Sequence, residues 1–262
     1  MSDRPAVVPG GTARIEIWSD IHCPWALIAL HRLRQARARL GAQVTFVPRA
    51  WPLEWVNQRG TPHDIVTTEV AALASHEPEL FNKYTEDSWP STFIPAFELV
   101  AAADRTGGAE LAEHVDYALR LAFFRDSANV SIEAGLRHAL DIARAYEPDC
   151  PADAIMSVWR TTNVRADVAA DFEQSKQVAI QGSPQVVWPD GSTTHNPGMS
   201  DHFWRGGLLR INSTDPDEPA RLLHGRCLPS CSASTSRKFK QTHDLYTWYG
   251  YVLRDHEGFC GL

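Results

Sequence analysis

The sequence predicts an α/β protein in which a long helical segment interrupts a small sheet. Three observations carry this prediction. A strand, a helix and a second strand follow one another within residues 13–60, an order typical of a βαβ unit with a parallel pair of strands. Residues 61–162 show helical periodicity and no strand alternation. Strand signals return within residues 163–211, after one more helix.

The elements of the first unit are defined by local patterns. Isoleucines alternate with charged residues over residues 14–18, as in a strand, and a second strand is predicted over 43–48. Leucines near helical spacing predict a helix over 25–40, and Gly41 ends it as a C-terminal glycine does. Four arginines occupy other positions of this helix, and we expect them to form its exposed face. They are Arg32, Arg34, Arg37 and Arg39.

The helical segment and the second part of the sheet follow. One helix is expected over residues 97–105, and the Gly107-Gly108 pair breaks it. A second helix continues beyond this break to about residue 123. Residues 185–188 and 193–195 are predicted to form a hairpin, because Asp190-Gly191 between them is a strong turn dipeptide.

Composition excludes several classes of protein. The 262 residues include 25 basic and 32 acidic side chains, a net charge of −7, so we expect no binding to nucleic acid, which requires basic patches over phosphates. No run approaches the roughly 18 apolar residues of a membrane span, so no membrane association is expected. Residues 1–12 lack the pattern of a signal peptide and are interpreted as a disordered leader on a cytoplasmic protein.

The five cysteines do not indicate a secreted disulfide scaffold, because their number is odd. Cys227 and Cys231 are separated by three residues, which imitates the spacing of a zinc site. Their flanks are rich in serine and irregular, so we expect no metal. Any redox chemistry is expected to be reactive rather than structural.

The strongest local signal is Cys23, which closes the first strand where the first helix begins. Pro24 suits the first helical position. Free N–H groups and the positive end of the helix dipole favour an anion there, so we expect the thiol to lose its proton more easily. His22 would add positive charge when protonated. The alternative is that Cys23 is simply a small buried residue.

A second signal precedes the predicted hairpin, at Gly182-Ser183-Pro184. Proline cannot donate to a ladder of strands, so its place directly before a strand requires a reason. One reason is a cis Ser183–Pro184 bond, which shapes tight sites. An ordinary trans proline at the start of a strand is the alternative.

Together these segments resemble the DsbA-like thiol oxidoreductases of the thioredoxin fold, especially the cytoplasmic FrnE-type branch. That family has a strand, Cys-Pro-Trp-Cys, a helix, a helical insertion and a Gly-x-Pro loop before a hairpin, and residues 13–211 follow the same order. The resemblance implies a thioredoxin-like core with an inserted all-helical domain. It also implies that Pro184 is cis and faces Cys23, that Ser183 pairs with the substrate, and that Trp25 shields the thiolate or touches the substrate. Plain packing of Trp25 is an equal alternative.

The sequence departs from the family at Ala26, where the second active-site cysteine is expected. Cys23 then acts alone through mixed disulfides, with glutathione or a distant cysteine such as Cys150 to release it. We expect Cys23 and Pro184 to be catalytic and His22, Pro24, Trp25 and Ser183 to contact the substrate. The partners expected are a disulfide-containing protein or small molecule and glutathione, with no tightly bound cofactor. A homodimer is left open.

Two other functions remain. Kappa-class glutathione transferases and 2-hydroxychromene-2-carboxylate isomerases share the layout, usually have serine at the active position and use glutathione. A redox-inactive binding module is the third hypothesis, with an ordinary thiol pKa at Cys23.

The resemblance also divides the chain. Residues 13–60 and 163–211 form the core, and residues 61–162 form an insertion that covers the site with aromatic residues, Trp89, Phe93 and Phe97 above all. Residues 212–262 are interpreted as an atypical C-terminal tail without an assigned function.

Overall fold

The computed structural model describes residues 12–60 and 62–227. Its main sheet has the order β2-β1-β3-β4. β1 is parallel to β2 and antiparallel to β3, and β3 is antiparallel to β4. The predicted parallel pair and the predicted hairpin are therefore confirmed. The strands are β1 (Ala13–Ser19), β2 (Val44–Ala50), β3 (Gln185–Val187) and β4 (Thr193–His195). Of the predicted leader, only Thr12 belongs to the described residues.

The first strand and helix form where the local pattern places them. In β1, Ile15 and Ile17 are buried, because alternate residues of a strand face the same side of the sheet. α1 (Pro24–Leu40) ends at Gly41, whose φ of 59° lies in the left-handed region that glycine adopts without strain. Most of the first half of α1 is buried, because the helix packs against α3, α4 and α8.

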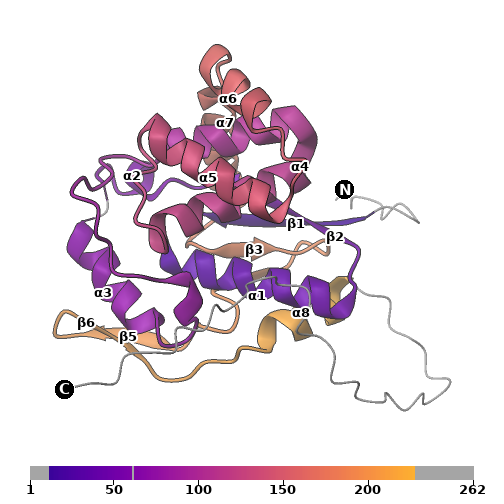
Figure 1. The fold of residues 1–262 in the computed structure, drawn as a ribbon. Helices are drawn as coiled ribbons and strands as arrows, with labels where there is room; N and C mark the ends of the chain where they lie inside the picture. Colours follow the sequence, from indigo (N-terminus) through magenta and orange to yellow (C-terminus); the bar gives the residue numbers. More distant parts are fainter. Residues whose placement is uncertain (1–11, 61, 228–262) are drawn as a thin grey trace, which may run out of the picture. The chain divides into compact units, whose positions relative to one another are not determined.

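Helices occupy both sides of the main sheet. Figure 1 shows α1 and α8 on one side of β1 and β3, with α4, α5, α6 and α7 on the other. α4 bends at Gly108 (φ 79°), so the predicted break at Gly107-Gly108 is present as a kink within one long helix. The helices between β2 and β3 are α2 (Leu53–Val56), α3 (His63–Leu73), the short 3₁₀ helix η1 (Pro78–Leu80), α4 (Ile94–Phe124), α5 (Glu133–Tyr146), α6 (Ala152–Thr161) and α7 (Arg165–Gln177).

The arginines of α1 do not form an exposed face, and this expectation is corrected. Arg34 and Arg37 both donate to Glu113 of α4, at 2.5 and 2.6 Å, and only 1% of the Glu113 side chain is exposed. Arg32 is buried and donates to Glu77 at 2.5 Å. The charges are thus taken up by acidic residues of the helical segment, and of the four only Arg39 is largely exposed.

Three elements that the sequence did not predict, two strands and a helix, follow the main sheet. β5 (His202–Arg205) and β6 (Leu208–Ile211) form a separate hairpin around Gly206-Gly207, whose positive φ values suit a tight turn. α8 (Glu218–Cys227) lies within residues 212–262, interpreted above as a tail, yet it packs against α1 and its Leu223 is fully buried. The remainder of that segment lies outside the described residues. Among the helices described, none is long and apolar enough to cross a membrane.

Candidate active site

The thiol of Cys23 contacts the loop before β3. Its Sγ donates to the carbonyl oxygen of Ser183 at 3.1 Å, and the Ser183–Pro184 peptide bond is cis. The Ser183 hydroxyl in turn accepts a hydrogen bond from the backbone N–H of Asp20 at 2.8 Å. The two motifs singled out in the sequence, 160 residues apart, therefore lie side by side in the fold.

Gly182 permits the close approach of this loop to β4. A Cβ atom at position 182 would lie 2.2 Å from Cε1 of the His195 ring, closer than carbon atoms approach without a shift. The backbone of Ser183, which accepts from Cys23, thus depends on a residue without a side chain directly before it.

The surroundings of Cys23 hold its proton on the sulfur. Burial above all, together with the charges of Glu69 and Asp20, raises the pKa of the Cys23 thiol to about 12, although the hydrogen bonds to Ser183 and Ala26 act to lower it. Only 6% of the residue is exposed. The helix N-terminus alone would lower this pKa, so the expected direction is wrong for this conformation, because the loss of hydration outweighs the helix.

Asp20 anchors the loop before Cys23 and orients His22. The carboxylate of Asp20 is 2.5 Å from Nδ1 of His22, and it accepts from the backbone N–H of His22 at 2.9 Å and of Leu53 at 2.6 Å. Burial raises the pKa of Asp20, but the charge of His22 and these hydrogen bonds outweigh burial and lower it overall. Asp20 is therefore an ionised carboxylate, fully buried, that holds the imidazole of His22.

His22 packs under the helical segment. Its ring stacks on Phe93 at 4.4 Å between centroids, and 2% of the residue is exposed. Nε2 of this ring is buried and has no hydrogen-bond partner among the described residues. Because Nδ1 faces a carboxylate, the proton of a neutral ring belongs on Nδ1 and the lone pair on Nε2. The imidazole is thus held by Asp20 on one side and unpartnered on the other.

Trp25, two residues after Cys23, contacts both α3 and β5. Its indole N–H donates to Glu69 of α3 at 3.2 Å, and its ring stacks on His202 of β5 at 4.2 Å. Burial raises the pKa of Glu69, against the hydrogen bond from Trp25 and the charge of His22. Trp25 is 6% exposed, so in this structure it packs between α3 and β5.

The helical segment also contacts the loop between β1 and Cys23. Arg120 of α4, 1% exposed, donates to the carbonyl oxygen of Asp20 at 2.7 Å and to the Ser19 hydroxyl at 2.8 Å. Both oxygens of Asp116 accept from the same guanidinium, at 2.9 and 3.0 Å. The loop before Cys23 is therefore built partly by residues of the insertion.

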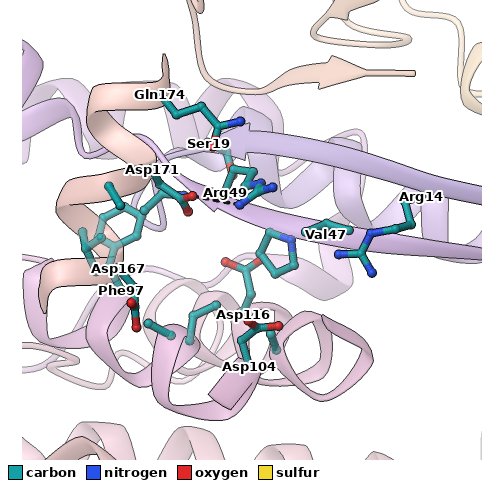
Figure 2. Close-up of a pocket in the computed structure, with 17 residues that line it drawn as sticks. Arg14, Ser19, Val47, Arg49, Phe97, Asp104, Asp116, Asp167, Asp171 and Gln174 are labelled. Carbon is teal, nitrogen blue, oxygen red and sulfur yellow. Dashed lines mark hydrogen bonds and ion pairs between the residues drawn. The ribbon is translucent and has the colours of Figure 1, made fainter. Parts of the chain in front are cut away.

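Of the three aromatic residues expected to face the site, Phe93 alone stacks on a residue of the Cys23 motif. Phe97 lines a cavity of about 330 Å³ between β2, α4 and α7, shown in Figure 2, whose lining is mixed polar and apolar. Arg49 bridges Glu16 and Asp171 beside this cavity, at 2.6 and 3.0 Å. Burial raises the pKa of Asp171. Trp89 lines a different, apolar cavity beside α3.

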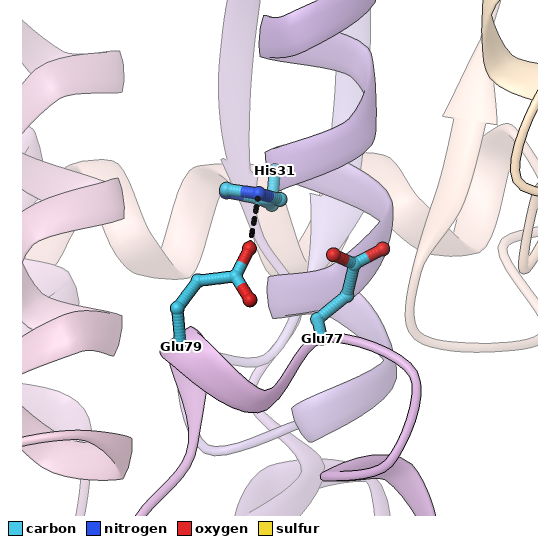
Figure 3. Close-up of side chains that lie close together, drawn as sticks. All are labelled: His31, Glu77 and Glu79. Carbon is cyan, nitrogen blue, oxygen red and sulfur yellow. Dashed lines mark ion pairs between the residues drawn. The ribbon is translucent and has the colours of Figure 1, made fainter. Parts of the chain in front are cut away.

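A third cluster has residue types that ligate metals. His31, Glu77 and Glu79 place one ligand atom each within 4.8 Å of one another. Figure 3 shows these three side chains. Glu77 is already paired with Arg32 at 2.5 Å, and Nδ1 of His31 lies 2.7 Å from the Tyr117 hydroxyl. These contacts account for the cluster as an ion-pair network that joins α1 to the η1 segment.

Sequence reasoning missed the roles of three residues that shape the site. Asp20 was part of the motif, but only its buried contacts reveal its role. Glu69 and Arg120 lie in the helical segment, and no spacing in the sequence relates them to Cys23, since their contacts span 44 and 100 residues.

Several chains of known structure share this fold. A protein from Nitrosomonas europaea provisionally described as a protein disulfide isomerase is 15% identical, covering 82% of this chain and 97% of its own, with a TM-score of 0.56. A probable DsbA oxidoreductase from Streptomyces coelicolor is 19% identical, covering 87% and 94%, with a TM-score of 0.52. A 2-hydroxychromene-2-carboxylate isomerase is 10% identical, covering 69% and 87%, with a TM-score of 0.51.

At these identities the likeness concerns the fold. It confirms the predicted thioredoxin-like α/β fold with a helical insertion. No protein-family model matches the sequence, and no curated protein sequence matches it.

Proposed function

We propose that this protein is a thiol–disulfide oxidoreductase in which Cys23 acts as a single cysteine and glutathione is the second substrate. One observation carries the proposal: Sγ of Cys23 lies 3.1 Å from the carbonyl oxygen of Ser183, beside Pro184, at the start of α1. This arrangement presents a sulfur next to backbone groups that can pair with an extended substrate. The DsbA-like fold supports the same chemistry at the level of the fold.

The proposed reaction has two exchanges. Cys23 loses its proton to solvent, and its thiolate attacks one sulfur of a disulfide, so that the substrate S–S bond breaks and one substrate thiolate leaves and takes up a proton. A glutathione thiolate then attacks the substrate sulfur of the mixed disulfide. This step returns Cys23 as a thiol and releases a glutathione–substrate disulfide, so that glutathione supplies the electrons.

The raised pKa of Cys23 sets the starting point of this cycle. At neutral pH the thiol is protonated, because burial and the nearby carboxylates disfavour its charge. The proposed attack therefore depends on a substrate that displaces Glu69 or admits water to the sulfur. Ala26 cannot resolve the mixed disulfide, which leaves an external thiol for that step.

A glutathione-dependent transferase or isomerase is the second candidate, and the protonated state of Cys23 favours it. A thiol that keeps its proton can donate a hydrogen bond, and Sγ of Cys23 lies within donating distance of Ser183. If it turned to bound glutathione instead, such a donor would stabilise the glutathione thiolate. Here Cys23 would not become covalently modified during turnover.

Trapping on Cys23 separates the two functions. The protein is incubated with bis(2-hydroxyethyl) disulfide and glutathione, reduction is followed, and the peptide containing Cys23 is examined by mass spectrometry. The proposal requires a mixed disulfide on Cys23 and a rate that is lost in Cys23→Ser but kept in Cys150→Ser, a matched change at another buried cysteine.

Equal activity of Cys23→Ser would overturn the proposal, and loss of activity in Cys150→Ser would overturn the single-cysteine route. Glutathione binding without any adduct on Cys23 would favour the second candidate.

A further inference from the structure

The helical insertion contains an apolar cavity that the chemistry of Cys23 does not use. It has a volume of about 470 Å³ and lies between α3 and the C-terminal end of α4, a size within the range of small-molecule sites. One wall is a single face of α3, because the residues recur at helical spacing. These are His63, Val66, Thr67, Val70, Ala71 and Ala74.

The opposite wall consists of aromatic rings that contact one another by their edges. Trp89 contacts Phe123 at 5.3 Å, Tyr84 at 4.9 Å and His63 of α3 at 4.4 Å between ring centroids. Phe81 and Phe124 complete the wall. Ring edges and faces thus line the space, and both are surfaces against which another ring packs favourably.

This wall is held in place by hydrogen bonds of its own. The Tyr84 hydroxyl donates to the carbonyl oxygen of Ser88 at 2.8 Å. Asn82 donates through its backbone to Phe124 at 2.9 Å and through its side chain to Arg125 at 2.7 Å. A wall fixed before a ligand arrives lowers the entropic cost of binding.

The polar groups of the lining are largely satisfied. The hydroxyls of Tyr84 and Thr67 and the amide of Asn82 already donate to backbone carbonyls. Lys83 also lines the cavity and carries an ammonium group, but this residue is exposed to solvent. A ligand inside the cavity would therefore meet rings and aliphatic side chains, which disfavours a charged or strongly polar molecule.

Packed rings link the wall of the cavity to the surroundings of Cys23. Phe123 contacts Phe93 at 5.0 Å, and Phe93 stacks on His22. From these observations we infer that the cavity between α3 and the end of α4 is a binding site for a small, uncharged aromatic molecule. This site does not depend on the redox activity of Cys23.

Indole is a suitable probe, and titration calorimetry on the full-length protein measures its binding. We expect saturable binding at one site, weakened by about tenfold or more in Ala71→Phe and in Val70→Phe, whose added rings fill the cavity. Ile65→Phe is the matched control on the same helix, because Ile65 is exposed and outside the lining, and it should bind within about twofold of the natural chain.

Thermal unfolding establishes that each variant is folded, and Cys23→Ser should bind indole normally. The inference would be overturned if indole showed no saturable binding. It would also be overturned if Ala71→Phe and Val70→Phe both bound indole as tightly as the natural chain does. Cyclohexanol tests the ligand class: weaker binding than indole is expected, and equal binding would overturn the preference for an aromatic ligand.

Discussion

The indole nitrogen of Trp25 donates to the carboxylate of Glu69 at 3.2 Å, which joins the first turn of α1 to α3 of the insertion. This bond places an acidic side chain close enough to Cys23 for its charge to raise the pKa of the thiol. A residue of the insertion, Glu69, therefore affects the pKa of a cysteine in the core.

Glu69→Gln should lower the pKa of Cys23. The amide keeps an acceptor for Trp25 but removes a negative charge, and a thiolate is more stable without that charge. The rate of Cys23 alkylation against pH, read on its tryptic peptide, should have a midpoint at lower pH than in the natural chain. Glu79→Gln, a change at a more exposed glutamate, should leave the midpoint where it was. A midpoint that stays or rises in Glu69→Gln would contradict the assignment.

Ala26→Cys should create an internal disulfide with Cys23. Position 26 follows in the first turn of α1, where the Ala26 N–H donates to the Cys23 carbonyl oxygen at 3.1 Å, and Ala26 is 1% exposed. The variant should lose two alkylatable thiols after mild oxidation and recover both on reduction. Ala29→Cys, one turn later and equally buried, serves as the control and should keep its thiols. Retention of both thiols in oxidised Ala26→Cys would mean that the geometry does not permit closure.

Asp20→Asn should destabilise the protein mainly at neutral pH. The pKa of Asp20 is lowered in the folded chain, so its carboxylate contributes stability above the ordinary carboxyl pKa and loses it as the pH falls through the lowered value. We expect a loss of about 1 to 3 kcal/mol in the free energy of unfolding at neutral pH. Urea unfolding should show a smaller difference at about pH 3. A difference that grows with acidity would show that the sign is wrong.

Gly182→Ala should impair the site, and a second change should restore it. The added Cβ would meet the His195 ring, so the loop that carries Ser183 must shift unless the ring moves. Disulfide reduction should fall in Gly182→Ala and recover in Gly182→Ala/His195→Ala, where the obstructing ring is gone. Because His195 is exposed, His195→Ala alone should unfold like the natural chain. Failure of the double variant to recover would indicate that the glycine matters for another reason.

The elements found from the sequence are those defined by neighbouring residues. Three of these signals are local: the alternation in β1, the glycine after α1 and the Asp190-Gly191 turn. They define the elements next to Cys23 and Ser183, and the fold then brings these two residues together. The arginines of α1 show the limit, since their spacing resembles a solvated face until Glu113 is brought to them by α4.

The pKa of Cys23 is misjudged for the same reason, because burial and Glu69 come from distant parts of the chain. The β5–β6 hairpin was missed although Gly206-Gly207 is a turn signal, because Phe203 and Trp204 are both exposed and break the usual alternation.

The contacts of Arg120 determine how this protein can unfold. A guanidinium from α4 satisfies the backbone of the loop that follows β1, and it is shut off from water together with Asp116. Moving α4 away from the core would leave buried donors and acceptors without hydrogen-bond partners. A local opening gains no free energy to offset that cost. The insertion is thus no detachable module. Amide protons of β1 and of the second half of α4 should exchange with solvent as one cooperative unit, at the free energy of global unfolding.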